Sequence, residues 1–171
     1  MALVTRRLAA VVVVVIGAVT TACTDGLDDP AASPDLDRDH FRCAVQPVLA
    51  ARCAFAGCHA SARRPLRIYA VGRLRLGVPW DRLAEPLGAD ELDANYQASR
   101  SFATVVGDQP SLLLAKPLDP RAGGYYHRGQ DLYGDDDVFV STDDRGYRLV
   151  AEWLAGADAP ADCVPTTEVM P

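Results

Sequence analysis

The segment Cys53-Ala-Phe-Ala-Gly-Cys58-His59 restricts the fold and the chemistry of this chain more than any other. Two cysteines with a histidine directly after the second form the arrangement that attaches c-type haem. Each thiol forms a thioether with a haem vinyl group, and the imidazole ligates the iron. The usual motif has two residues between the cysteines, and this chain has four. The motif predicts covalent haem c, held by Cys53, Cys58 and His59, with a longer loop between the attachment points.

The chain has five cysteines, and each can be given a role. The haem motif uses two of them, and Cys23 belongs to an N-terminal leader. Cys43 and Cys163 remain, and we expect them to form a disulfide whose long loop contributes about 4–5 kcal/mol in the chain-entropy model. In the alternative scheme the two motif cysteines form a second disulfide, which leaves the position of His59 unexplained. Zinc ranks last, because no second Cys/His pair completes a four-ligand site.

The N-terminal part has the composition of an export leader followed by a linker. Two arginines precede an apolar run over residues 8–19, and small residues then lead to Cys23. This pattern resembles a bacterial lipoprotein signal, which implies removal of residues 1–22 and lipidation of Cys23; an ordinary secretory signal is the alternative. Residues 23–38, rich in acidic residues and proline, predict a disordered linker. We therefore expect a membrane-anchored lipoprotein facing the periplasm or the cell exterior, where disulfides persist.

Composition and charge indicate one globular domain without a nucleic-acid site. The chain has 171 residues, 49% of them hydrophobic, and a net charge of −6, which supplies no basic patch for nucleic acid. The acidic surface predicts docking to a basic redox partner with salt-dependent rates. Four arginines are expected to be surface charges, with haem propionates or a redox partner as alternative contacts: Arg63, Arg64, Arg73 and Arg75.

Hydrophobic periodicity predicts an all-α domain over residues 39–164 with long irregular loops and a C-terminal tail, residues 165–171. The expected helices cover residues 39–51, 90–105 and 143–155, with short helical segments at residues 80–87 and 111–115. Pro47 predicts a kink or restart in the first helix. The expected N-caps are Asp39, Asp90 and Thr142. Asp135-Asp136-Asp137 fits no EF-hand spacing, and we expect a solvated loop there.

Several segments together resemble a small c-type cytochrome domain of exported bacterial lipoproteins. They are residues 41–53, the Cys58-His59 pair, residues 110–117, Gly123-Gly124 with His127, and residues 147–156. The resemblance spans residues 39 to 156 and implies an all-α, cytochrome c-like fold in which the first and last helices cross beside the haem. A disulfide between Cys43 and Cys163 is compatible with that crossing. The family carries single electrons and needs no catalytic side chain.

The sixth iron ligand is predicted from the few methionines and histidines that the chain offers. Met1 leaves with the leader, and Met170 is next to the last residue. His127 lies in a glycine-rich loop, where the family supplies its distal ligand, whereas His40 is expected to face solvent. We therefore predict ligation of the iron by His59 and His127.

The function predicted from the sequence is electron transfer by one covalently attached haem c. An alternative of another class is a non-haem lipoprotein binding module stabilised by two disulfides. A weaker alternative is a haem enzyme with an open distal side.

Overall fold

The computed structural model describes residues 34–105, 110–128, 134 and 136–163. The expected leader, Cys23, the linker as far as residue 33, Met170 and the tail lie outside these residues. The described part is helix-rich and contains no β-strand, in agreement with the expected all-α class; its single β-bridge joins Leu118 and Phe139. None of the described helices combines the length and the apolar character that crossing a membrane requires.

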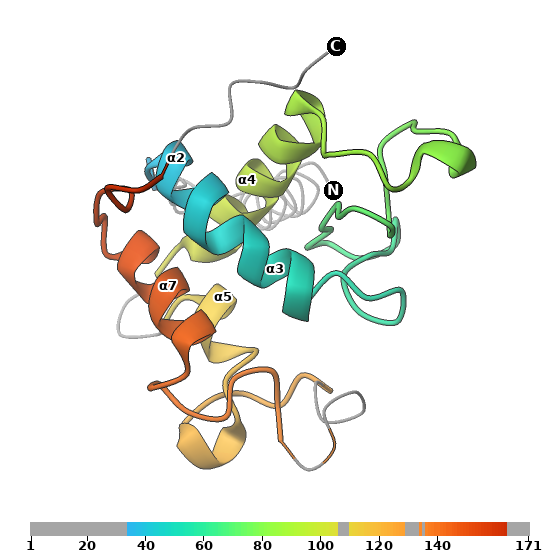
Figure 1. Ribbon diagram of the computed structural model, residues 1–171. Helices are drawn as coiled ribbons and strands as arrows, with labels where there is room; N and C mark the ends of the chain where they lie inside the picture. The colour runs from blue at the N-terminus through green and yellow to red at the C-terminus, as the bar shows by residue number, and fades with distance from the viewer. Residues whose placement is uncertain (1–33, 106–109, 129–133, 135, 164–171) are drawn as a thin grey trace, which may run out of the picture. The chain divides into compact units, whose positions relative to one another are not determined.

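The first helical segment is one continuous rod built from three pieces (Figure 1). They are α2 (Arg38–His40), the π-helical η1 (Phe41–Val45) and α3 (Gln46–Arg52). Asp37 caps this rod by accepting the backbone N–H of His40, so the N-cap precedes the expected Asp39 by two residues. Pro47 lies in the first turn of α3, where its missing N–H is tolerated, and the wider π-helical turn precedes it without a break.

The remaining helical elements are η2 (Trp80–Arg82), α4 (Ala89–Ala103), α5 (Leu112–Ala115), η3 (Pro120–Ala122) and α7 (Arg145–Leu154). Gly88 precedes α4 and Asp144 caps α7, so the expected caps Asp90 and Thr142 are wrong by two residues each. The Asp144 carboxylate accepts two N–H groups of the first turn, as an N-cap must. Gly156 ends the last helical segment in a left-handed conformation with φ of 77°, as expected.

The main core forms where the first rod, α4 and α7 meet. Three buried aromatic rings from these elements contact one another: the centroid of Phe41 lies 5.2 Å from that of Trp153 and 5.5 Å from that of Tyr96. The Trp153 indole N–H donates to the carbonyl oxygen of Asp37 over 2.8 Å, which satisfies its polar atom. The last helix therefore packs against the first rod through its most buried side chain.

The packed region begins before residue 39. Leu36 is buried in the main core, and its carbonyl oxygen accepts the Tyr96 hydroxyl. The carbonyl oxygen of Pro34 accepts the Arg100 Nε–H over 2.7 Å. Residues 34–38, which the composition places in the linker, are thus held against the helices.

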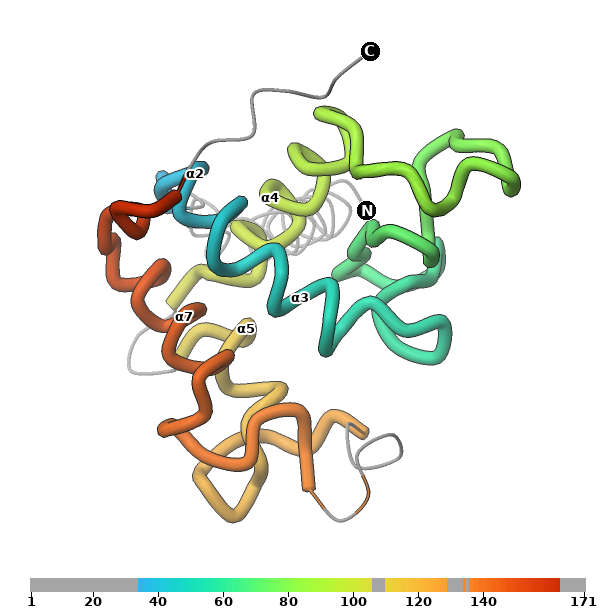
Figure 2. Tube along the Cα trace, in the orientation of Figure 1, coloured from blue at the N-terminus to red at the C-terminus, as the bar shows by residue number. Residues whose placement is uncertain are grey.

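The long connection between α3 and α4 lies on the opposite side of the first rod from α7 (Figure 2). A buried ion pair fixes its second half, because Arg75 Nε lies 2.8 Å from Glu91 Oε1 and both side chains are almost fully buried. Burial alone would raise the pKa of Glu91, but hydrogen bonds from Arg75 and from the N–H groups of Leu76 and Gly88 outweigh it and lower that pKa. The expected surface position of Arg75 is therefore wrong.

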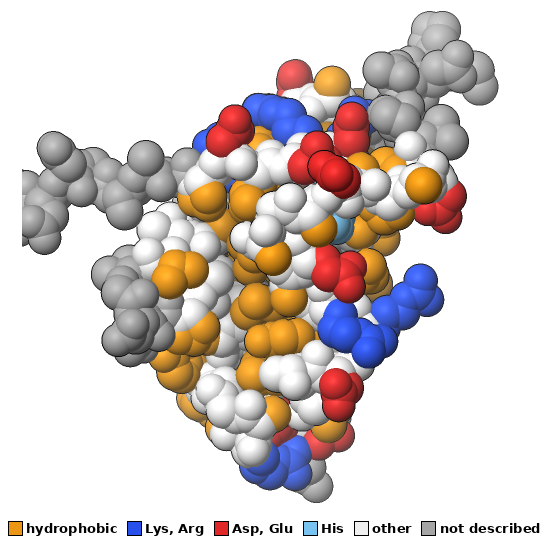
Figure 3. All heavy atoms as spheres, turned by 90° about the vertical axis from the view of Figure 1, so that its left-hand side faces the viewer, with side chains coloured by type: hydrophobic (Ala, Val, Ile, Leu, Met, Phe, Trp, Pro, Cys, Tyr) orange, Lys and Arg blue, Asp and Glu red, His pale blue; other side chains and the backbone are white. Residues whose placement is uncertain are grey.

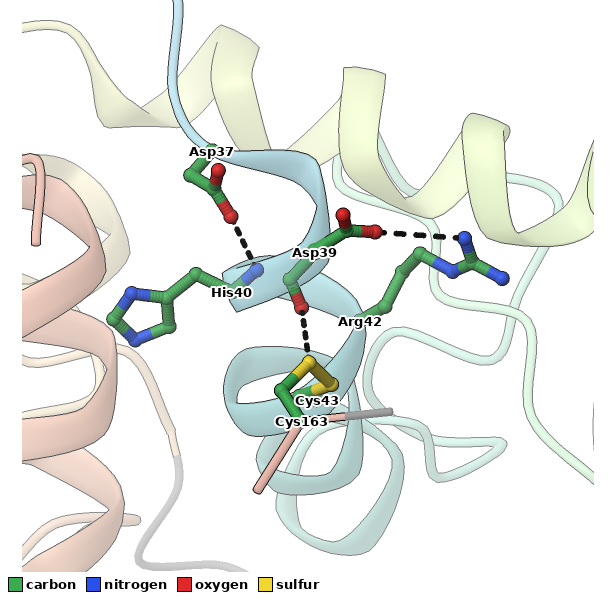
Figure 4. Close-up of a disulfide and its surroundings, with 6 residues drawn as sticks. All are labelled: Asp37, Asp39, His40, Arg42, Cys43 and Cys163. Atoms are coloured by element: carbon green, nitrogen blue, oxygen red, sulfur yellow. Dashed lines mark hydrogen bonds and ion pairs between the residues drawn. A yellow bond between two sulfur atoms is a disulfide. The ribbon is translucent and has the colours of Figure 1, made fainter. Parts of the chain in front are cut away.

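The predicted disulfide between Cys43 and Cys163 is present, with the two Cα atoms 5.7 Å apart (Figure 4). It joins η1 to the segment that follows α7, across 120 residues of sequence. The Cys163 sulfur lies 3.4 Å from the carbonyl oxygen of Asp39, at the start of the first rod. The bond therefore reinforces the contact that the aromatic core makes between the first and last helices.

His40 is buried, in contrast to the expected solvent-facing position. Its ring points away from the disulfide (Figure 4), and its Nδ1 lies 2.8 Å from the carbonyl oxygen of Ala157. The segment after α7 folds back over the start of the first rod, and this return covers a position that an isolated helix would expose.

Removing the disulfide through Cys43→Ala and Cys163→Ala is expected to lower the free energy of unfolding by about 2–5 kcal/mol, because the unfolded chain regains conformational freedom. Denaturant unfolding with and without dithiothreitol measures this difference in the unaltered protein, and the double variant is the control in which the reductant should have no effect. A reductant effect of equal size in the double variant would contradict the assignment and indicate a bond between Cys53 and Cys58.

Candidate functional site

The loop from Cys53 to His59 folds back on itself, so that its ends meet. Cys53 follows the last residue of α3, and its N–H donates to the Leu49 carbonyl oxygen. The N–H of His59 donates to the carbonyl oxygen of Cys53 over 3.1 Å, and two further bonds to the Phe55 carbonyl oxygen close the turn between them. The longer spacing is thus absorbed within the loop, and the backbone of His59 lies beside that of Cys53.

The two motif cysteines are free thiols, so the alternative of a second disulfide is not formed. Cys53 is buried, and this burial raises the pKa of its thiol to about 12, with a smaller contribution from the charge of the nearby Cys58. Cys58 is half-buried. The loop therefore carries two reduced thiols, and His59 directly follows the second of them in sequence.

His59 is oriented by its own downstream segment. Its Nδ1 lies 2.8 Å from the carbonyl oxygen of Leu66, and its backbone carbonyl accepts the N–H of Ile68 over 2.9 Å. A carbonyl oxygen only accepts, so Nδ1 carries the proton and Nε2 keeps its lone pair in the neutral ring. This confirms the expectation that a backbone carbonyl holds the imidazole of His59, which leaves Nε2 as the atom available to a metal.

The electrostatic surroundings of His59 keep its imidazole neutral. Burial lowers the pKa of His59, and the charges of His127 and Arg64 lower it further, against the opposing hydrogen bond to Leu66. Neutral imidazole is the form that ligates metals. The same effect shows that the ring of His127 lies close enough to interact electrostatically with that of His59.

His127 is held in the same manner by a different acceptor. Its Nδ1 lies 3.1 Å from Oδ1 of Asp137, whose side chain is fully buried, while the ring of His127 is 19% exposed. The carboxylate accepts the Nδ1 proton, so in the neutral ring of His127 the lone pair lies on Nε2. The second Asp137 interaction is with the N–H of Val138, at 2.7 Å.

A small second hydrophobic core supports the loop that carries His127 and Asp137. Phe139 and Leu118 pack together with Tyr147 of α7, and backbone hydrogen bonds pair residues 117–119 with Phe139. Gly124 passes so close to Leu118 that a Cβ atom would lie 1.8 Å from the Leu118 carbonyl oxygen. The glycine-rich composition of this loop therefore serves close backbone packing.

Buried Asp119 organises the same loop. Its carboxylate accepts the backbone N–H and the guanidinium of Arg121, and these bonds hold the pKa of Asp119 well below its usual range. The N–H of Asp137 also donates to Asp119, over 3.2 Å. Asp119 thereby sets the backbone position from which the Asp137 side chain reaches His127.

Arg52 connects the two halves of the site. It stands immediately before Cys53, and its Nη1 donates to the carbonyl oxygen of Val138 over 2.9 Å and to Asp144 over 3.0 Å. The end of α3, the residue after Asp137 and the cap of α7 are therefore joined by one guanidinium group.

Arg128 follows His127 with φ of 72°, the only positive value at a non-glycine residue within the described ranges. A left-handed conformation costs an ordinary residue about 1–3 kcal/mol. The chain thus accepts local strain directly after the second imidazole, which fixes the direction in which the loop leaves it.

Of the four residues that the sequence predicted for the haem site, Cys53, Cys58 and His59 share one loop, and the charge of His127 acts on the imidazole of His59. Sequence reasoning missed Asp137 and the Leu66 carbonyl oxygen. The expectation of a solvated loop is wrong for Asp137, which is buried, and holds for half-exposed Asp136; Asp135 lies outside the described residues. An acidic residue ten positions after a candidate histidine carries no signal that separates it from its acidic neighbours.

No family model, curated protein or solved structure matches this chain. Among the residues that the structure describes, no three His, Cys, Asp or Glu side chains gather as ligands for a metal ion.

Asp137→Ala is expected to lower the free energy of unfolding by about 1–3 kcal/mol, because it leaves the Nδ1–H of His127 and the N–H of Val138 without their acceptor. Denaturant unfolding measures the change. Asp136→Ala is the matched control: its exposed pair with Arg121 predicts a loss of about 0.5 kcal/mol or less. Equal losses in the two variants would mean that Asp137 acts through the charge of the loop and not through its hydrogen bonds.

Proposed function

We propose that this protein is a c-type cytochrome that transfers single electrons and binds one haem through Cys53, Cys58, His59 and His127. One observation carries the proposal: His59 and His127, which interact electrostatically, each have Nδ1 engaged by an acceptor, so that Nε2 is the lone-pair nitrogen of each neutral ring. A pair of free thiols adjoins the first imidazole. A haem iron takes two ligands from the protein, and this donor set supplies them.

The donor set fits haem c in each of its parts. Cys53 and Cys58 would form the thioethers, His59 would be the proximal ligand and His127 the distal one. When bound, the haem supplies a one-electron redox centre. The chain's own contribution is to orient both imidazoles, to lower the pKa of His59 through burial, and to set the basicity of the two rings through Leu66 and Asp137.

The two ligands differ in the group behind them, and this difference has a consequence for the potential. A carboxylate raises the basicity of an imidazole more than a neutral carbonyl does. The buried charge of Asp137 therefore favours the more positive, oxidised iron, and a histidine in place of methionine acts in the same direction. We expect a low-potential carrier.

The leader supports export of this carrier as a membrane-anchored lipoprotein. Its basic pair, apolar run and Cys23 have the order that such a signal requires. The Cys43–Cys163 disulfide is consistent with an oxidising compartment.

Protein expressed with the haem-attachment machinery is expected to retain haem on a denaturing gel, and its pyridine haemochrome spectrum is expected to report two thioether bonds. Cys53→Ser and Cys58→Ser should each leave one thioether, with the corresponding shift of the haemochrome band. The double variant Cys43→Ser and Cys163→Ser is the control and should keep both. Absence of covalent haem from the unaltered protein would refute the proposal and favour a disulfide-stabilised binding module.

His127→Ala is expected to convert a low-spin ferric EPR signal to a high-spin one and to allow carbon monoxide and cyanide to bind, because it removes the sixth ligand. His40→Asn is the control, since His40 is a buried histidine held by a backbone carbonyl elsewhere in the fold. A high-spin signal or a methionine–iron charge-transfer band in the unaltered protein would remove His127 as a ligand; the high-spin case would favour a haem enzyme with an open distal side.

A further inference from the structure

The charges of this acidic protein are segregated along the chain. Residues 40–80 contain seven arginines and no aspartate or glutamate, although the chain as a whole has a net charge of −6. The Cys53–His59 loop lies in the middle of this stretch. The Cys53–His59 half of the candidate haem site is therefore flanked along the chain by arginines and by no acidic residue, although the chain as a whole is acidic.

Three of the seven arginines are neutralised by carboxylates. Arg42 pairs with Asp39, Arg52 with Asp144, and Arg75 with Glu91. The other four form no ion pair with any carboxylate in the described part of the chain: Arg63, Arg64, Arg67 and Arg73. We call these four residues the arginine cluster.

The arginine cluster is built onto the Cys53–His59 loop by hydrogen bonds to neutral groups. Arg64 donates to the Gly57 carbonyl oxygen over 3.1 Å, and its charge acts on the imidazole of His59. Arg73 donates to the carbonyl oxygens of Ala50 and Ala54, and its guanidinium lies 4.2 Å from the centroid of the Phe55 ring.

The other two members of the cluster extend it along the chain. Arg67 donates to the Ala62 carbonyl oxygen, next to exposed Arg63. These bonds orient the guanidinium groups without cancelling their charge.

We propose that the arginine cluster is the docking surface for a protein partner with an acidic face. The role of this partner rests on the proposed function: the partner exchanges electrons with the haem. Guanidinium groups match carboxylates in a planar, two-bonded geometry, and unpaired charges beside a redox site steer an oppositely charged partner toward it. The local positive charge thus favours an acidic partner, whereas the negative net charge of the whole chain predicts a basic one.

The same stretch exposes apolar side chains, as protein-binding surfaces do. Trp80 is 85% exposed, and Val71 and Leu76, on either side of Arg73, are each about half exposed. Tryptophan and arginine dominate the binding energy of protein interfaces. Because backbone carbonyls hold three of the four guanidinium groups in place, the charges suit a structured array of carboxylates better than a fluid lipid surface.

Charge reversal separates this surface from the rest of the molecule. The variant Arg63→Glu/Arg64→Glu removes the two exposed members of the cluster. Arg145→Glu/Arg148→Glu is the matched control: it makes the same change in net charge on two exposed residues of α7. The side of the molecule that carries α7 has acidic and basic side chains mixed together (Figure 3). If the first variant fails to fold, Arg63→Glu alone replaces it, because the Arg63 side chain makes no hydrogen bond within the residues that the structure describes.

Binding of the full chain to a glutamate homopolymer at about 10 mM salt, where charges act over about 30 Å, is the first measurement. We expect binding that weakens at least about tenfold in Arg63→Glu/Arg64→Glu and less than about twofold in the control. Equal weakening in both variants, binding to a lysine homopolymer instead, or binding only to anionic phosphatidylglycerol vesicles would overturn the proposal. This measurement does not depend on haem, so it remains decisive if the proposed function fails.

The second measurement follows once a pyridine haemochrome spectrum has verified the haem content. It compares the rates at which ferricyanide and a cationic cobalt complex oxidise the reduced protein. The anionic reagent is expected to react at a rate that falls with rising salt, and the cluster variant is expected to lose this dependence. A rate that rises with salt, as the net charge predicts, would contradict the proposal. A changed reduction potential with unchanged homopolymer binding would assign the arginines to the haem propionates instead.

Discussion

The contact of Trp153 with Phe41 and Tyr96 is the constraint on which the rest of the described structure depends. It fixes α7 against the first rod, and the Cys43–Cys163 disulfide holds the same crossing covalently. The crossing brings the N-terminal end of α7 to the C-terminal end of α3, where Arg52 bridges them. The C-terminal end of α3 continues into the Cys53–His59 loop, and the N-terminal end of α7 follows the loop that carries His127. The loops that carry the two imidazoles therefore depend on an aromatic contact that lies outside both of them.

The second imidazole depends on a buried carboxylate, which requires compensation. Asp137 accepts the N–H of Val138 and the Nδ1–H of His127, while neighbouring Asp119 is satisfied by Arg121. Two buried carboxylates close together are costly unless hydrogen bonds and a cation offset their desolvation. The described parts of this loop, residues 117–128 and 136–139, are thus organised by polar bonds as much as by their small apolar core.

Local features of the site were predictable from the sequence, and those that depend on distant segments were not. The Cys/Cys/His spacing, the pairing of Cys43 with Cys163 and the all-α class follow from adjacency, count and periodicity. The caps of the first rod and of α7 were misplaced because several acidic residues stand near each start, and the cap of α4 because Gly88 has no side chain to mark it. The burial of His40 and of Arg75 depends on segments that return from elsewhere in the chain. Asp137 could not be separated from Asp136, because only the fold decides which carboxylate turns inward.

The four-residue spacer of the motif, Ala54 to Gly57, connects the proposed haem site with the proposed docking surface. The His59 N–H donates to the Cys53 carbonyl oxygen, so the longer spacer does not separate the backbones of these two residues. The spacer residues also hold two members of the arginine cluster. The Gly57 carbonyl oxygen accepts Arg64. The Ala54 carbonyl oxygen and the ring of Phe55 hold Arg73. A loop of two residues has fewer such groups. The longer spacing is therefore best explained as the support for basic side chains beside the proposed haem site.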